Sequence, residues 1–108
     1  MSRDVEKFVR IQEPVVIRGK REKGWRTIPL GDRVRVWEMS MADAVADEVV
    51  PGFSNKRYIF HVGFVEHVAA GCLVTYMGST FSVLSVSDST RLRGLEMRCA
   101  PAPHLAAN

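Results

Sequence analysis

Side chains capable of metal binding or nucleophilic chemistry gather between residues 61 and 72. They are His61, Glu66, His67 and Cys72. A zinc site uses three or four such ligands at a recognisable spacing, and the spacing here matches none. Cys72 and Cys99 lack an identifiable activating partner, no serine occupies a strand-to-helix elbow, and there is no glycine-rich phosphate loop. We therefore expect a protein that is not an enzyme and has no metal or cofactor.

A second candidate set consists of acidic residues in an alanine-rich segment, residues 41–55. The set is Asp43, Asp47 and Glu48. The segment breaks the alternation of apolar and polar residues on either side of it, and Pro51-Gly52 ends it. We therefore expect a long inserted loop or a short helix there. An acidic run of this kind is usually a solvated face.

A third candidate set lies in a basic loop, residues 18–26. The first 38 residues carry ten Lys/Arg against six Asp/Glu and so have a net charge of +4, whereas the remaining residues have a net charge of −1. Five of the basic residues surround one indole, and the set is Arg18, Lys20, Arg21, Lys23, Trp25 and Arg26. Basic side chains neutralise phosphates and an indole stacks on a base, so the loop is a candidate docking or nucleic-acid surface. A solvated hairpin with Trp25 packed on the protein explains the same pattern.

Short β-strands must position these residues. Apolar residues recur with a period of two between Gly, Pro and Asp turn signals, and the segments are 8–17, 25–30, 32–41, 56–65, 72–77, 80–86 and 91–100. Gly78 marks a tight turn between two of them, and Gly94 predicts a bulge in the last. At this size a closed barrel avoids exposed strand edges. We expect an all-β fold, a small single-domain antiparallel β-barrel of about six strands. Residues 1–100 form the domain, 41–55 its inserted loop, and 101–108 a flexible tail.

Length and composition are those of one ordinary domain. The chain has 108 residues, of which 46% are hydrophobic and 25% charged, as in soluble globular proteins. No apolar run approaches the roughly 18 residues that span a bilayer, and the first residues have no apolar signal core. We therefore expect folding in a cytoplasm, no membrane partner, and free, buried thiols at Cys72 and Cys99.

The order of features along the chain is also informative. It comprises RIQEP (Arg10–Pro14), a charged turn leading to Gly24-Trp25, VRVWEMSM (Val34–Met41), and a long final stretch from Gly71 to Cys99. In this order, over about residues 8 to 100, the chain resembles the head–tail joining proteins of long-tailed bacteriophages, also called head-completion, stopper or connector proteins. The order and spacing of the strands carry the resemblance, since each motif alone is a strand with a turn.

The resemblance implies a structural protein of the phage neck. Such proteins are small β-barrels with a long inserted loop, and they form a ring of roughly six or twelve copies of one chain. The ring lies between portal or adaptor proteins and tail-terminator or tail-tube proteins, and it closes the DNA-filled head until the tail docks. The chain would be made in the host bacterial cytoplasm and end in the virion. Its acidic loop would reach a neighbour or line the lumen, where carboxylates repel passing genomic DNA. The alternative is a small β-barrel nucleic-acid-binding module using loop 18–26 and Trp25.

Overall fold

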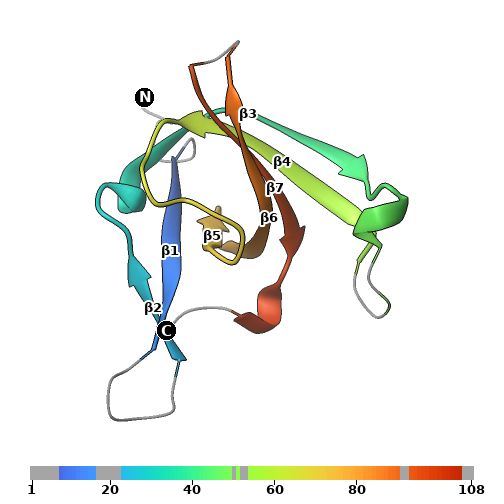
Figure 1. Ribbon diagram of the computed structural model, residues 1–108, viewed down its shortest axis with the longest axis horizontal. Helices are drawn as coiled ribbons and strands as arrows, with labels where there is room; N and C mark the ends of the chain where they lie inside the picture. Colours follow the sequence, from blue (N-terminus) through green and yellow to red (C-terminus); the bar gives the residue numbers. More distant parts are fainter. Residues whose placement is uncertain (1–7, 17–22, 50, 52–53, 91–92, 106–108) are drawn as a thin grey trace.

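Seven antiparallel strands form one sheet that bends round on itself (Figure 1). The computed structural model describes residues 8–16, 23–49, 51, 54–90 and 93–105. In chain order the strands are β1 (Phe8–Val16), β2 (Lys23–Thr27), β3 (Val34–Asp43), β4 (Lys56–Gly63), β5 (Leu73–Tyr76), β6 (Ser79–Ser89) and β7 (Gly94–Pro101). Among the described residues, three short 3-10 turns accompany them: η2 (Gly31–Arg33), η3 (Ala46–Glu48) and η4 (Pro103–Leu105). No helical turn in the described ranges is long and apolar enough to cross a membrane.

The sheet closes into a barrel because β1 pairs with strands from both ends of the sheet. The strand order is β2-β1-β3-β4-β7-β6-β5, and β5 returns to β1 through pairs that run from Arg10↔Thr75 to Gln12↔Leu73. The pairings therefore form a ring from β1 through β3, β4, β7, β6 and β5 back to β1, with β2 attached to β1 beside it. The predicted small antiparallel barrel of about six strands is confirmed.

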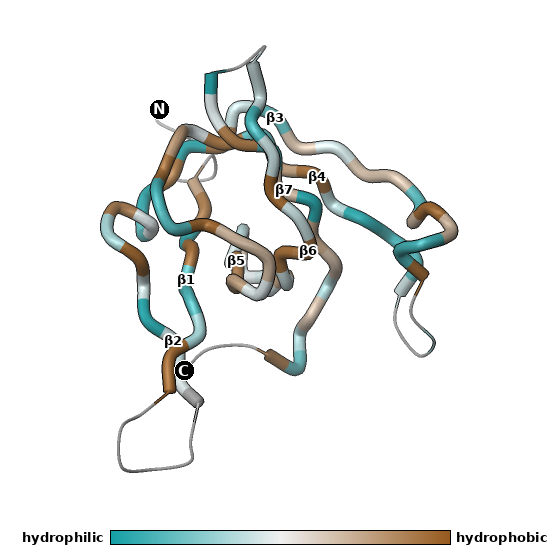
Figure 2. The backbone as a smooth tube through the Cα atoms, in the orientation of Figure 1, coloured by the Kyte–Doolittle hydropathy of each residue, from teal (hydrophilic) through white to brown (hydrophobic). Residues whose placement is uncertain are grey.

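Buried apolar residues of the strands that form the barrel ring supply the core. In β4, Phe60 and Val62 are completely buried, and Met97 of the paired strand β7 joins them. The Phe60 ring meets Tyr76 and Phe81 edge-on, with centroids 5.3 and 5.4 Å away. Hydrophobic and hydrophilic residues alternate along the strands in Figure 2, as a barrel filled by side chains requires. Burying each large apolar side chain contributes roughly 2 kcal/mol to folding.

The turn predicted at Gly78 joins β5 to β6 in the shortest type of hairpin. Tyr76 pairs with Ser79, which leaves Met77 and Gly78 as the two turn residues. Both have positive φ, 49° and 82°. Two central residues with positive φ match the right-handed twist of the flanking strands, and Gly adopts such a φ without strain.

The long β3–β4 hairpin projects from the barrel as an arm, defined here as residues 36–59 (Figure 1). β3 pairs with β1 only through Val34 and Arg35, and it then continues along β4 as far as the pair Asp43↔Lys56. A register shift between Val36 and Glu38 marks a bulge at the point where β3 leaves β1. Within the residues that the structure describes, the arm therefore extends beyond the part of β3 that pairs with β1.

Two predicted boundaries of the inserted loop and tail need correction. Residues 41–43 belong to β3, because they pair with residues 56–58 of β4, so the loop starts later than predicted and contains η3. The described part of the predicted flexible tail packs on the barrel: Pro101 pairs with Phe81, and the buried Ala102 donates its N–H to the Thr80 carbonyl at 2.9 Å. Residues 106–108 lie outside the described ranges.

Candidate assembly surface

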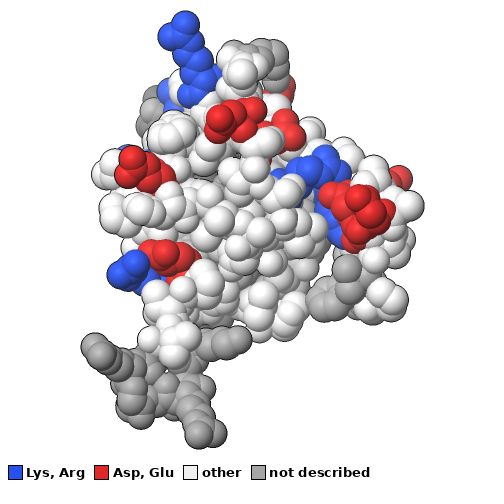
Figure 3. Space-filling model, in the orientation of Figure 1, with Lys and Arg blue, Asp and Glu red and all other residues white. Residues whose placement is uncertain are grey.

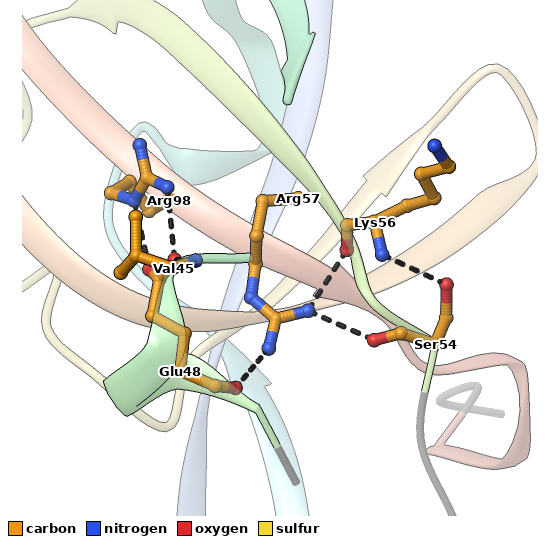
Figure 4. Close-up of polar contacts among 6 residues, drawn as sticks. All are labelled: Val45, Glu48, Ser54, Lys56, Arg57 and Arg98. Atoms are coloured by element: carbon orange, nitrogen blue, oxygen red, sulfur yellow. Dashed lines mark hydrogen bonds and ion pairs between the residues drawn. The ribbon is translucent and has the colours of Figure 1, made fainter. Parts of the chain in front are cut away.

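A buried arginine fixes the connection between β3 and β4 (Figure 4). Arg57 is only 1% exposed. Its Nη1 donates to the carbonyl oxygens of Ser54 and Lys56 at 3.0 and 2.9 Å, and its Nη2 donates to the carbonyl of Glu48. One side chain therefore satisfies backbone carbonyls from both sides of the connection.

Glu48 is held against the outer wall of the barrel. Arg98 in β7 donates from Nε to Oε2 at 3.0 Å and from Nη2 to Oε1 at 3.1 Å, and Oε1 also accepts the N–H of Val45 at 2.9 Å. The hydrogen bonds from Arg98, and then from Val45, lower the pKa of Glu48 to about 2 because they stabilise the carboxylate. The ion pair of Glu48 with Arg98 thus anchors η3 on β7. The sequence pattern did not indicate this role.

The Glu48–Arg98 pair predicts a pH dependence of stability. The ordinary pKa of the glutamate is 4.5 and its pKa in the folded protein is about 2. A lowered folded pKa stabilises the fold fully above the ordinary value, and this contribution is lost as the pH falls toward the folded value. As the pH is lowered, we expect the free energy of unfolding to decrease more steeply in the wild type than in Glu48→Gln. Urea unfolding at a series of pH values from about 7 to about 2.5 measures this free energy in both proteins. Parallel curves of unfolding free energy against pH would contradict the prediction.

The other two predicted acidic residues lie on either side of Val45. Asp43 ends β3 and accepts a hydrogen bond from Lys56 Nζ at 2.8 Å, which lowers its pKa. Asp47 is exposed in η3 at the outer end of the arm. The arm therefore brings Asp43, Asp47 and Glu48 into one region, but only Asp47 is without an ion-pair partner among the described residues.

The predicted basic loop is only partly described. Arg18, Lys20 and Arg21 lie outside the described residues, and Lys23 begins β2. Trp25 is half-buried in β2 opposite Pro14. Arg26 is exposed and bonded to Glu13, with Nε and Nη2 at 3.1 and 2.5 Å from Oε2. On the face shown in Figure 3, charged side chains lie in separate places around a broad uncharged centre.

The exposed apolar residues along one edge of β3 belong to none of the candidate residue sets. Trp37, Met39 and Met41 are 50%, 40% and 64% exposed. Within the described ranges, residues 36–43 pair with β4 on one side and with no strand on the other. The sequence signal for such a surface is that segment 32–41 carries large residues on both faces of the strand, such as Val36 on one face and Trp37 on the other. Natural proteins normally protect an exposed edge with charges, Pro or a covering segment, so an apolar edge indicates a contact site.

Arginine side chains stack on aromatic rings at the start of this edge. The Arg35 guanidinium lies 4.7 Å from the centre of the Trp37 ring, and the Arg33 guanidinium lies 5.3 Å from that of Phe8. Such cation–π contacts orient the arginines over the rings. The stretch from Arg33 to Trp37 therefore combines positive charge with aromatic surface.

The histidine and cysteine candidates of the sequence do not form one site. His61 lies in β4 with Nε2 3.0 Å from Glu96 and Nδ1 3.5 Å from Glu38, whereas Cys72 is buried before β5. Among the residues that the structure describes, no group of three or more His, Cys, Asp or Glu is arranged to hold a metal ion. Cys99 is also free and buried, and burial raises its pKa to about 12, which disfavours the reactive thiolate.

No protein-family model, curated protein or solved structure matches this chain.

Proposed function

We propose that the protein is a structural component of a bacteriophage neck. Copies of the chain form a ring between the portal or adaptor proteins and the tail, complete the DNA-filled head and offer the surface on which the tail docks. The observation that carries the proposal is the projecting arm with its exposed Trp37, Met39 and Met41. An unpaired apolar edge supports association with another protein surface better than catalysis or small-molecule binding. The resemblance of the sequence to head–tail joining proteins supplies the place of assembly.

The shape of the chain is compatible with a ring. A ring is built from heterologous contacts, in which each copy uses two different surfaces. The arm and the β1–β2 hairpin lie on opposite sides of the barrel in Figure 1. The barrel between them is closed and has a single core, so it can act as a rigid spacer.

Deletion of the gene in the phage or prophage that encodes the chain tests the proposal. We expect negative-stain microscopy to show DNA-filled or leaking heads beside separate, complete tails, and supplying the wild-type gene in trans should restore joined particles. The protein should also be present in purified particles. Normal, infectious particles after deletion would overturn the neck assignment.

The second candidate function is nucleic-acid binding, favoured by the Arg33–Phe8 and Arg35–Trp37 stacks. Trp37 is exposed and Phe8 is half-buried, and basic side chains beside accessible aromatic rings are the elements of a single-strand site. Normal particles after deletion, together with single-stranded DNA or RNA binding that weakens steeply with salt, would favour this function over the neck assignment.

A further inference from the structure

Among the strand edges that are open in the described part of the chain, two differ in character. The first is residues 36–43 of β3, which is long and combines the exposed Trp37, Met39 and Met41 with two acidic residues. The second is β2, which has five residues and pairs only with β1. Figure 1 shows β2 and the arm on opposite sides of the barrel. Every copy of the chain therefore carries these two open edges, one long and one short, on opposite sides of the barrel.

The charges at the two edges are complementary. β2 has the sequence KGWRT, with two basic residues and no acidic one. The arm carries Asp43 at the end of β3 and Asp47 in η3. Asp43 and Arg26 each have a partner within the chain, Lys56 and Glu13, but both pairs are on the surface. Exposed pairs of this kind are weak and can exchange for a contact with a second molecule.

Apolar side chains accompany both edges. Val16 is 72% exposed and pairs with Lys23 at the outer end of the β1–β2 hairpin, and Trp25 of β2 is half-buried. Met39 and Met41 lie along the edge of β3. Joining these edges would satisfy backbone N–H and C=O groups and remove apolar surface from water at the same time.

We propose that the open edge of β3 pairs with β2 of a second copy of this chain, so that the barrels join head to tail through one continuous sheet. The inference rests on the proposed function and specifies its ring contact. A heterologous pair of this kind leaves the arm of one copy and the hairpin of the other available for the next contact, so the assembly continues until it closes. Pairing of β3 with β3 would instead give a closed dimer and leave β2 unused.

Cross-linking in particles tests the pairing, with cysteines introduced at Ser40 in β3 and Thr27 in β2, both exposed. The native Cys72 and Cys99 are buried and serve as an unreactive background. The gene deletion is complemented with the double variant Ser40→Cys/Thr27→Cys, and purified particles are treated with a short bis-maleimide. We expect a ladder of cross-linked multimers. The matched control is Ser87→Cys/Thr27→Cys, since Ser87 is an exposed residue of β6, and it should give no ladder.

Each outcome decides between the two proposals. If particles contain the chain but both double variants leave it uncross-linked, the edge pairing is wrong and the neck assignment stands. Cross-linked dimers from Ser40→Cys alone would overturn the pairing in favour of a β3–β3 contact. If the chain is absent from particles, the proposed function itself is wrong.

A charge substitution gives an independent readout. Met41 is exposed, so Met41→Lys should fold normally, but a lysine on the edge opposes pairing and meets the basic β2 of the neighbour. We expect Met41→Lys to lose the cross-linked ladder, whereas Met41→Glu retains more of it. Equal loss in both variants, with normal unfolding curves, would contradict the charge complementarity between the two edges.

Discussion

Arg57→Ala is expected to lower the free energy of unfolding by roughly 3 kcal/mol, because each buried carbonyl left without a donor costs about 1–3 kcal/mol. The side chain is buried and donates to carbonyl oxygens of Ser54, Lys56 and Glu48. Water can hydrate some of these carbonyls after the substitution. We therefore expect the cost of about one unsatisfied carbonyl rather than three. Urea unfolding at neutral pH measures the change.

Matched variants separate the hydrogen bonds of Arg57 from its volume and its charge. Arg57→Met keeps much of the volume, so it should recover little of the loss if the hydrogen bonds dominate. Arg57→Lys keeps the charge but lacks the planar fork that reaches several carbonyls at once. Lys56→Ala removes an adjacent exposed cation, and we expect no measurable change. If Arg57→Ala were as stable as Lys56→Ala, the role given to Arg57 would be wrong.

Arg57 also shows what a single sequence could predict in this region. Alternation within segment 56–65 predicts that Tyr58, Phe60, Val62 and Phe64 share one side of a strand, and Phe60 and Val62 are buried. Phe64 is exposed because β4 ends at Gly63, one residue earlier. The burial of Arg57 on the opposite side was not predictable from alternation. It depends on η3 folding back over the outer wall, which is a tertiary contact.

The predicted turn depends on neighbouring residues in the chain, whereas the sites that the sequence did not indicate depend on tertiary contacts. The hairpin at Gly78 depends on local turn chemistry, because a glycine adopts the positive φ of a tight turn without strain, whereas the positive φ of Met77 does not follow from its residue type. The role of Glu48 depends on Arg98, which is 50 residues away in the chain. The two-sided pattern of segment 32–41 indicates a surface, but the open side depends on how far β3 pairs with β1, which in the described residues is Phe8↔Arg35 and Val9↔Val34. Long-range partners of this kind leave no local signal.

Gly94→Ala is expected to be the other strongly destabilising substitution. A Cβ at Gly94 would lie 2.0 Å from the carbonyl oxygen of Val62 and 3.4 Å from Cα of Gly63. The bulge predicted at Gly94 is absent, since Gly94 pairs regularly with Gly63 and Ser89, and the glycine is needed for close approach of two backbones. A carbonyl within a strand ladder cannot move away as the end of a side chain can. We therefore expect a loss of roughly 3 kcal/mol, at the upper end of the usual cost of overpacking.

Gly71→Ala is the control that distinguishes steric overlap from backbone strain. Gly71 has a φ of +98°, and a Cβ there would have nothing within 4 Å. The substitution should therefore cost only the strain of a left-handed backbone, about 1–2 kcal/mol. Urea unfolding of the two variants gives the comparison, and a loss in Gly94→Ala no larger than in Gly71→Ala would contradict the close contact between β4 and β7. Because β7 also carries Arg98, separation of these strands should loosen the anchor of η3, and Gly94→Ala should then lose the steeper pH dependence that Glu48 gives the wild type.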